Sequence, residues 1–180
     1  RGQDLAFDRV VVDQRQPPAA GAGRRQIRGP RGGHAMQQRI AGARRALREF
    51  GIHDHDPIIV SGTLPQYEMG MAAANHLFDE SPHPTAIFAL TDVTAVGVMH
   101  AAAQRGLSVP AALSVIGFDD IPLAGFMIPS LTTVAQPIRA MGQEAARLVL
   151  EQIEYPDFEP EHVVLPTHLV VRDSTRAYTG

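Results

Sequence analysis

Residues 113–137 read LSVIGFDDIPLAGFMIPSLTTVAQP, and no other stretch of the chain says as much about its fold. The apolar run Leu113–Ile116 predicts a buried strand, and two carboxylates follow it closely. A second β-rich run, Leu131–Val134, ends just before the polar residue Gln136. In open α/β sheets, ligands bind beyond the carboxyl ends of the strands. The segment therefore predicts one wall of a small-molecule site.

Outward from this segment, strand patterns and helix patterns alternate along the chain. Apolar runs predict further strands at Val10–Val12, Ile58–Ser61 and Thr85–Leu90. Residues 17–31, rich in Gly, Pro, Ala and Arg, predict a loop around a weak strand at Arg25–Arg28. Apolar stripes at helical spacing predict helices from Ala35 to Phe50, from Pro65 to Leu77, from Asp92 to Gly106 and from Ile138 to Ile153. Two short strands are predicted at the end, at His162–Leu165 and Leu169–Arg172. This order is typical of right-handed βαβ units, so we expect an α/β fold with a parallel sheet flanked by helices.

Length and composition narrow the class of protein. A chain of 180 residues is expected to form about one domain, and its apolar runs are too short to span a bilayer. The absence of cysteine excludes disulfides and thiol chemistry, and it fits a cytoplasmic location. Arginines are concentrated in residues 1–50, but they are spread without interleaved aromatic residues, which favours a solvated surface over a nucleic-acid site.

Motifs for catalysis or for a cofactor are weak in this sequence. The run His53–Asp56 reads HDHD, which is more typical of a solvated loop than of a metal site. The segment Gly21–Gly23 lacks the third glycine of a dinucleotide fingerprint, and no Gly-x-Ser-x-Gly nucleophile elbow occurs. We expect no catalytic residue, no metal and no cofactor.

Ordered motifs over most of the chain resemble the effector-binding domain of LacI-type transcriptional regulators. They are QRIAG at 38–42, PTAIFA at 84–89, GLSVP at 106–110, LSVIGFDD at 113–120, LTTV at 131–134 and LVVRDST at 169–175. The resemblance runs from about Val10 to Thr175. It implies a periplasmic-binding-protein-like fold, in which the effector lies between two subdomains.

The resemblance covers mainly the C-terminal subdomain, residues 10–137, with strands at 160–175 that return to it. Residues 138–154 match a helix that packs on the N-terminal subdomain in the family. Because the resemblance places neither that subdomain nor a DNA-binding domain in these residues, we expect the helix either to be unusually exposed or to pack against a neighbouring chain. Between Asp13 and Gly29 the sequence is too short and too polar for the helix and strand that the family has there.

Six residues are candidate ligand contacts. Asp119, which matches an effector-binding position of the family, lies where a carboxylate can accept paired hydrogen bonds from vicinal hydroxyls or ring N–H groups. Arg39 matches an arginine that reaches into the family's cleft, although a solvated helix arginine is the alternative from the sequence alone. The other candidates are Gln136 at a strand end, Thr91 where the family often has Asn, Phe118 as a stacking or core residue, and Leu64 near the pocket entrance. The two neighbouring aspartates have structural interpretations: Asp120 in a turn and Asp92 as a helix N-cap.

The loop from Ile121 to Ser130 is almost free of charge and carries four large apolar residues: Leu123, Phe126, Met127 and Ile128. It matches part of the family's dimer contact and predicts a homodimer, although it could also fold back on its own core.

The sequence predicts the effector-sensing and dimerisation region of a LacI-type regulator, and no enzyme. The expected effector is a sugar, a sugar phosphate or a nucleobase-like molecule. We expect operator DNA to be contacted only through the absent N-terminal domain, and no contact with membranes. The alternative is an extracytoplasmic sugar-binding protein of the same fold that serves transport, which a signal peptide upstream would indicate.

Overall fold

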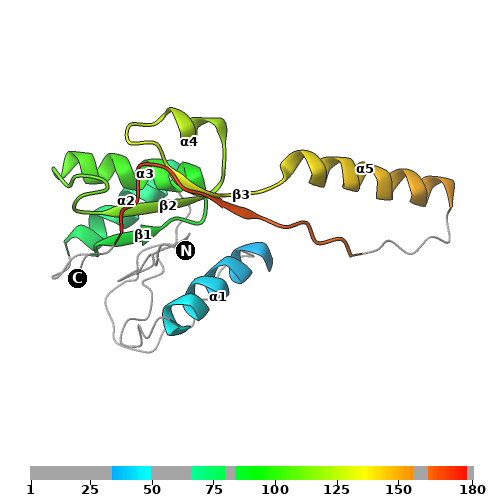
Figure 1. Cartoon of the computed structure of the whole chain (residues 1–180), viewed down its shortest axis with the longest axis horizontal. Coiled ribbons are helices and arrows are strands. Elements are labelled where there is room, and N and C mark those ends of the chain that lie inside the picture. Colours follow the sequence, from blue (N-terminus) through cyan, green and yellow to red (C-terminus); the bar gives the residue numbers. More distant parts are fainter. Residues whose placement is uncertain (1–33, 50–65, 80–83, 156–161, 178–180) are drawn as a thin grey trace.

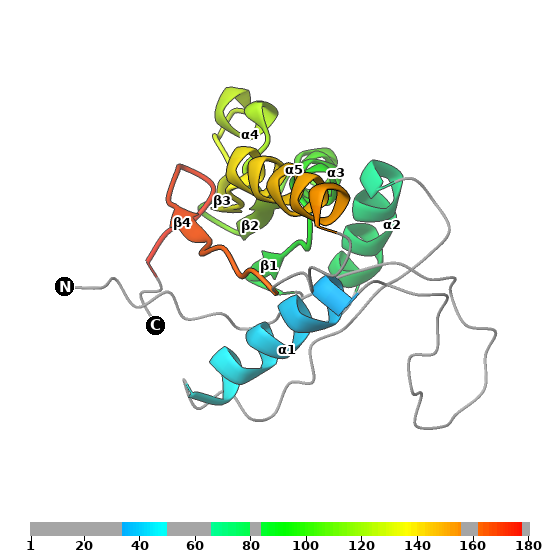
Figure 2. The ribbon, with the colours of Figure 1, turned by 90° about the vertical axis from the view of Figure 1, so that its right-hand side faces the viewer.

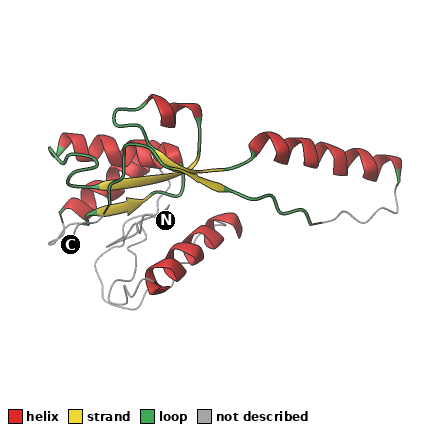
Figure 3. Ribbon diagram, in the orientation of Figure 1, coloured by secondary structure: helices red, strands yellow, loops and turns green. Residues whose placement is uncertain are grey.

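The computed structural model describes residues 34–49, 66–79, 84–155 and 162–177 (Figure 1). In chain order its elements are α1 His34–Glu49, α2 Gln66–Phe78, β1 Ala86–Phe88, α3 Asp92–Gln104, β2 Ser114–Asp119, α4 Pro122–Phe126, β3 Thr132–Ala135, α5 Ile138–Glu154 and β4 His168–Val170. Within these ranges the four strands form one sheet in the order β1-β2-β3-β4 (Figure 3).

The sheet is parallel except at one edge. β1 pairs with β2 and β2 pairs with β3 in parallel, while β4 runs antiparallel to β3. Phe88 lies opposite Ile116, and Asp119 lies opposite Ala135. The carboxyl ends of β1, β2 and β3 therefore meet at one edge of the sheet, as the predicted α/β fold requires.

Helices cover both faces of this sheet. Ile87 of β1 and Val115 of β2 pack into the main core with residues of α2 and α3. Phe88, the next residue along β1, joins a smaller cluster on the other face with Leu47 of α1. Successive side chains of a strand point to opposite faces of the sheet. Because both faces are covered by helices, the strands are continuously apolar and do not alternate.

Two glycines allow α2 and α3 to approach each other closely. A Cβ on Gly70 would lie 2.1 Å from the carbonyl oxygen of Thr94, and a Cβ on Gly97 would lie 2.1 Å from that of Tyr67. Any larger residue at either position would push the helices apart.

A buried serine ties the end of the described chain to the middle of the sheet. The hydroxyl of Ser174 donates to the carbonyl of Val115 at 2.6 Å and accepts from the backbone N–H of Thr132 at 2.8 Å. Because all three groups are buried, these bonds hold residues 172–175 against β2 and β3.

Helix α5 projects from the carboxyl end of the sheet, as the views in Figures 1 and 2 show. None of its residues is buried, although it carries the exposed apolar side chains of Ile138, Met141, Val149, Leu150 and Ile153. The exposure expected for this helix is confirmed.

One predicted strand does not form, and three others fall outside the described residues. His162–Leu165 does not form a strand, because β3 ends its pairing at Ala135 opposite His168 and offers no partner to earlier residues. The strands predicted at Val10–Val12, Arg25–Arg28 and Ile58–Ser61 lie outside the described residues. Among the helices described, none is long and apolar enough to cross a membrane.

Candidate functional site

Four of the predicted ligand residues converge at the carboxyl edge of the sheet. Arg39 comes from α1, Phe118 and Asp119 end β2, and Gln136 follows β3. The amide Nε2 of Gln136 donates to Oδ1 of Asp119 at 2.6 Å, and Nη2 of Arg39 lies 3.7 Å from the same oxygen. Asp119 and Gln136 lie 80 and 97 positions after Arg39 in the sequence, and the three residues thus meet around one carboxylate.

Asp119 is held in an unusual backbone conformation. Its φ is 122°, and that of Asp120 is 57°, so two consecutive non-glycine residues lie at positive φ. Such conformations cost about 1–3 kcal/mol each and persist only where the surroundings impose them. The turn directs the Asp119 side chain along the sheet edge, where Gln136 and Arg39 bind it.

Burial raises the pKa of the Asp119 carboxyl above its ordinary value. The hydrogen bond from Gln136 and the charge of Arg39 lower that pKa, and the neighbouring charge of Asp92 raises it further. Desolvation is the largest of these effects, because the carboxylate loses water that its two donors only partly replace.

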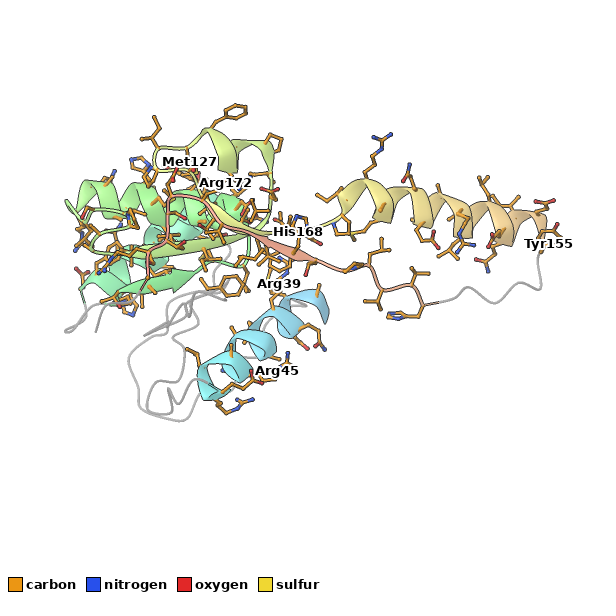
Figure 4. The ribbon with its side chains drawn as sticks, viewed as in Figure 1. Arg39, Arg45, Met127, Tyr155, His168 and Arg172 are labelled. Carbon is orange, nitrogen blue, oxygen red and sulfur yellow. The ribbon has the colours of Figure 1, made fainter. Side chains whose placement is uncertain are left out.

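Arg39 lies between α1 and the sheet (Figure 4). Its Nη1 donates to the carbonyl of Leu90 at 2.5 Å, and its guanidinium carbon lies 3.7 Å from the ring centre of Phe118. A cation over an aromatic ring is attracted by the negative face of the ring. This face of Phe118 is therefore occupied by Arg39, and a ligand could stack there only if Arg39 moved.

Thr91 is placed at the same edge, but its hydroxyl has structural partners. Its Oγ1 accepts from the backbone N–H of Thr94 at 3.2 Å and donates to Oε1 of Gln66 at 3.1 Å. Thr91, and not Asp92, is the N-cap of α3, so the prediction of an Asp92 cap is wrong. Gln66, at the start of α2, is a neighbour of the site that no local sequence signal indicated.

Asp92, the first residue of α3, is fully buried. Its Oδ1 accepts from the hydroxyl of Thr133 at 2.5 Å, and its Oδ2 accepts from the backbone N–H of Ile121 at 2.9 Å. These partners are 41 and 29 residues away, which is why a local capping role was the only one that the sequence suggested.

Asp120 holds the turn, as predicted, through a residue that sequence reasoning missed. Nη2 of Arg172 donates to its Oδ1 at 2.7 Å, and Nη1 of Arg172 donates to the carbonyl of Leu131 at 2.9 Å. The antiparallel return of β4 beside β3 brings Arg172 to this place, and no spacing within the segment foretells it. Leu64, the remaining ligand candidate, and His53–Asp56 lie outside the described residues.

The arrangement offers acceptors and donors side by side. Asp119 can accept two hydrogen bonds, Arg39 presents a planar fork of donors, and Gln136 can do both. Within the described part of the chain, no group of three His, Cys, Asp or Glu side chains is placed to hold a metal ion.

The apolar loop predicted for dimer contact includes the short helix α4. Leu123 is 48 %, Phe126 81 % and Ile128 98 % exposed, whereas Met127 is partly buried against the core. Beside the loop lies an open groove of about 500 Å³, lined by residues of α3, by Tyr67, and by residues 107–109 and 127–129. The loop does not fold back fully on its own core.

Comparison with known proteins places this geometry in a family. The periplasmic binding protein-like domain matches residues 19–175. The chain belongs to that family. Its relatives and structural neighbours are LacI-type regulators, which confirms the resemblance drawn from the sequence.

Two curated relatives show the extent of the similarity. The catabolite control protein A of Priestia megaterium is 39% identical over 139 residues, which cover 77% of this chain and 42% of that protein. The HTH-type transcriptional repressor CytR of Escherichia coli (strain K12) is 38% identical over 151 residues, which cover 84% of this chain and 44% of that protein. The chain spans less than half the length of these relatives.

Two solved structures of this domain are similar in fold. A LacI family regulator from Enterococcus faecium, with bound ribose, has a TM-score of 0.79 at 29% identity over 97% of this chain and 59% of that one. A complex of the regulator CelR with cellobiose has a TM-score of 0.75 at 31% identity over 93% of this chain and 47% of that one. The periplasmic-binding-protein-like fold is thereby established for this chain.

Proposed function

We propose that this chain is the effector-sensing and dimerisation region of a LacI-type transcriptional regulator that acts in the cytoplasm. The observation that supports this most is the convergence of Arg39, Asp119 and Gln136 on the edge where parallel sheets bind ligands. The relatives named above include a transcriptional repressor and two transcriptional regulators whose structures hold ribose or cellobiose, which favours regulation over a transport role. No bond is made or broken in this function.

The proposed effector is a small molecule rich in hydroxyl groups, such as a sugar. A carboxylate that accepts from vicinal hydroxyls and a guanidinium that donates to ring oxygens together match such a ligand. Ribose and cellobiose, which are bound in related structures, are the first molecules to test. A sugar phosphate and a nucleoside belong in the same panel.

The test is a thermal-shift screen of the intact protein against this panel. A ligand present at about 100 times its Kd stabilises the native state by about 2.7 kcal/mol, which raises Tm by roughly 5 °C or more for a domain of this size. Asp119→Ala and Arg39→Ala should each abolish the shift. Arg45→Ala is the matched control, because Arg45 lies on the same helix with a side chain 74% exposed. A full shift in both site variants would refute the assignment.

We propose further that the loop around α4 forms a homodimer contact. Its exposed Phe126 and Ile128 are large apolar side chains that a second copy would cover, and the adjacent groove offers a surface to receive them. Light scattering should give twice the monomer mass for the wild type and the monomer mass for Ile128→Asp. Val171→Asp, a change at another residue 60% exposed, should leave the mass unchanged.

Helix α5 carries exposed apolar side chains and has no buried residue. We propose that its apolar residues pack on a second subdomain outside these 180 residues, with residues 10–137 and 160–175 forming the C-terminal subdomain. Leu150→Glu should then lower the Tm of the intact protein while leaving that of the 180-residue chain unchanged. Equal effects on both would contradict the proposal.

DNA contact is proposed to need a separate DNA-binding domain of the regulator. The 180-residue chain should therefore not shift operator DNA in a gel, whereas the intact protein should. Tight, sequence-specific binding by the 180-residue chain would contradict this.

A further inference from the structure

The segment that joins the proposed ligand site to the proposed dimer contact is very short. Asp119 ends β2, Asp120 and Ile121 follow, and Pro122 opens α4. Both aspartates have positive φ, so this turn is strained and needs external support. Its geometry decides both where the Asp119 carboxylate points and where α4 begins.

Two groups support the turn from outside. Arg172 binds the side chain of Asp120, and the buried carboxylate of Asp92 binds the backbone N–H of Ile121 at 2.9 Å. The second contact acts on the backbone, directly after the strained residues. It comes from the start of α3, next to Thr91 at the site edge.

The same carboxylate also reaches β3. Its other oxygen accepts from the hydroxyl of Thr133 at 2.5 Å. Gly117 of β2 leaves room for it, since a Cβ there would lie 2.2 Å from Oδ1 of Asp92. One buried side chain at the start of α3 thus contacts three other segments, namely the turn at Ile121, β2 at Gly117 and β3 at Thr133.

We propose that Asp92 is a positioning residue that fixes the turn between the effector site and the dimer loop. A displacement of α3 relative to the sheet would then move Ile121 at the start of α4 through the Asp92 carboxylate, and with it Asp119, which lies two residues earlier along the chain. The link to an effector and to a dimer rests on the proposed function, but the hold of Asp92 on Ile121 does not.

Three variants separate positioning from general stability. Asp92→Ala removes both hydrogen bonds. Asp92→Asn can keep them, because the amide oxygen can accept from Ile121 while the amide nitrogen donates to the hydroxyl of Thr133. Thr133→Val removes one bond and leaves the contact with Ile121 in place.

The first measurement is NMR-detected amide hydrogen exchange on the 180-residue chain. A hydrogen bond to a charged group corresponds to roughly tenfold or more in an equilibrium constant, so Asp92→Ala should speed exchange at Ile121 by about tenfold or more relative to amides in α2. Asp92→Asn, whose bond to Ile121 is neutral and therefore weaker, should lie between wild type and Asp92→Ala at Ile121, and Thr133→Val should remain close to wild type there. Faster exchange to the same extent throughout α2, α3 and β2 would show a general stabilising role and overturn the proposal.

The second measurement is the dissociation constant of the homodimer, by analytical ultracentrifugation. Asp92→Ala should weaken the dimer and Asp92→Asn should restore it. An unchanged dissociation constant in Asp92→Ala would overturn the link to the dimer loop. If the wild type is monomeric, the dimer proposal itself fails, and the exchange rate of Ile121 alone decides the role of Asp92. If Asp92→Ala does not fold, Asp92→Ser, which is small and keeps one acceptor, takes its place in both measurements.

Discussion

Replacing Gly97 with alanine tests the packing on which the main core depends. In the middle of α3, the new Cβ would lie 2.1 Å from the carbonyl oxygen of Tyr67, 2.9 Å from the backbone nitrogen of Met71 and 3.1 Å from the Cα of Gly70. All three are backbone atoms of α2, so no side-chain rotation can relieve the contact. The two helices would have to separate by about 1 Å, and gaps of this size forfeit roughly a quarter to a half of each lost dispersion contact.

The net cost follows from two opposing effects. Overpacking of a close-packed core costs about 1–3 kcal/mol and occasionally more, whereas alanine gains about 1 kcal/mol over glycine in a helix interior. Because the clash involves backbone on both sides, we expect an overpacking cost near the upper end of its range. After the gain from alanine, the free energy of unfolding should fall by about 2 kcal/mol. With an m-value of about 2 kcal/mol/M in urea, the midpoint of unfolding should fall by about 1 M.

The assay is urea unfolding followed by far-UV circular dichroism. Gly42→Ala in α1 is the matched control, because a Cβ there meets nothing within 4 Å. It should leave the midpoint unchanged or raise it by up to about 0.5 M, from helix propensity alone. A Gly97→Ala variant as stable as the wild type would refute the close approach of the two helices.

Two further perturbations probe the sheet and the site. Ser174→Ala leaves the N–H of Thr132 and the carbonyl of Val115 buried without a partner, so the free energy of unfolding should fall by about 1–3 kcal/mol in urea; Ser130→Ala, whose hydroxyl binds only exposed Asp173, should change it by less than about 0.5 kcal/mol. The raised pKa of Asp119 means that the folded state binds this proton more readily than the unfolded state, so its contribution to stability is present at low pH and is lost as pH rises from the ordinary value of 3.8 through the raised value. The free energy of unfolding, measured as a function of pH, should show this loss in the wild type and not in Asp119→Asn. An identical curve for Asp119→Asn would contradict the reasoning.

Much of the fold could be predicted from hydrophobic periodicity and from the residues that begin and end helices. The boundaries of α3 follow from a polar start and from Gly106, which adopts a φ of 70° just after the helix as a glycine stop does. The strands β1, β2 and β3 each overlap their predicted runs, because buried parallel strands are read from continuous apolar residues. The failed strand at His162–Leu165 has a suitable pattern, but pairing needs a neighbour, and β3 is too short to supply one.

The polar contacts of the site were less accessible to sequence reasoning. Resemblance indicated Asp119, Arg39 and Gln136, and their mutual geometry follows once parallel strands align their ends. The partners of Asp92 and Arg172 could not be predicted, because each depends on segments brought together by the completed sheet. Local rules assign an aspartate before a helix to a cap, and here the preceding threonine takes that role.

The internal contacts of Asp119 bear on how the proposed effector would bind. Gln136 donates to Oδ1 of Asp119 and Arg39 lies beside the same oxygen, so an effector that binds this oxygen must exchange these internal contacts for its own. Such an exchange conserves the number of hydrogen bonds, and the net affinity then depends on how well the ligand matches the fixed geometry. The exchange also releases Gln136, which lies one residue before Pro137 and the start of α5. A ligand at Asp119 would, under the proposed function, act on the junction between the sheet and the projecting helix, through which a signal to the rest of a regulator would pass.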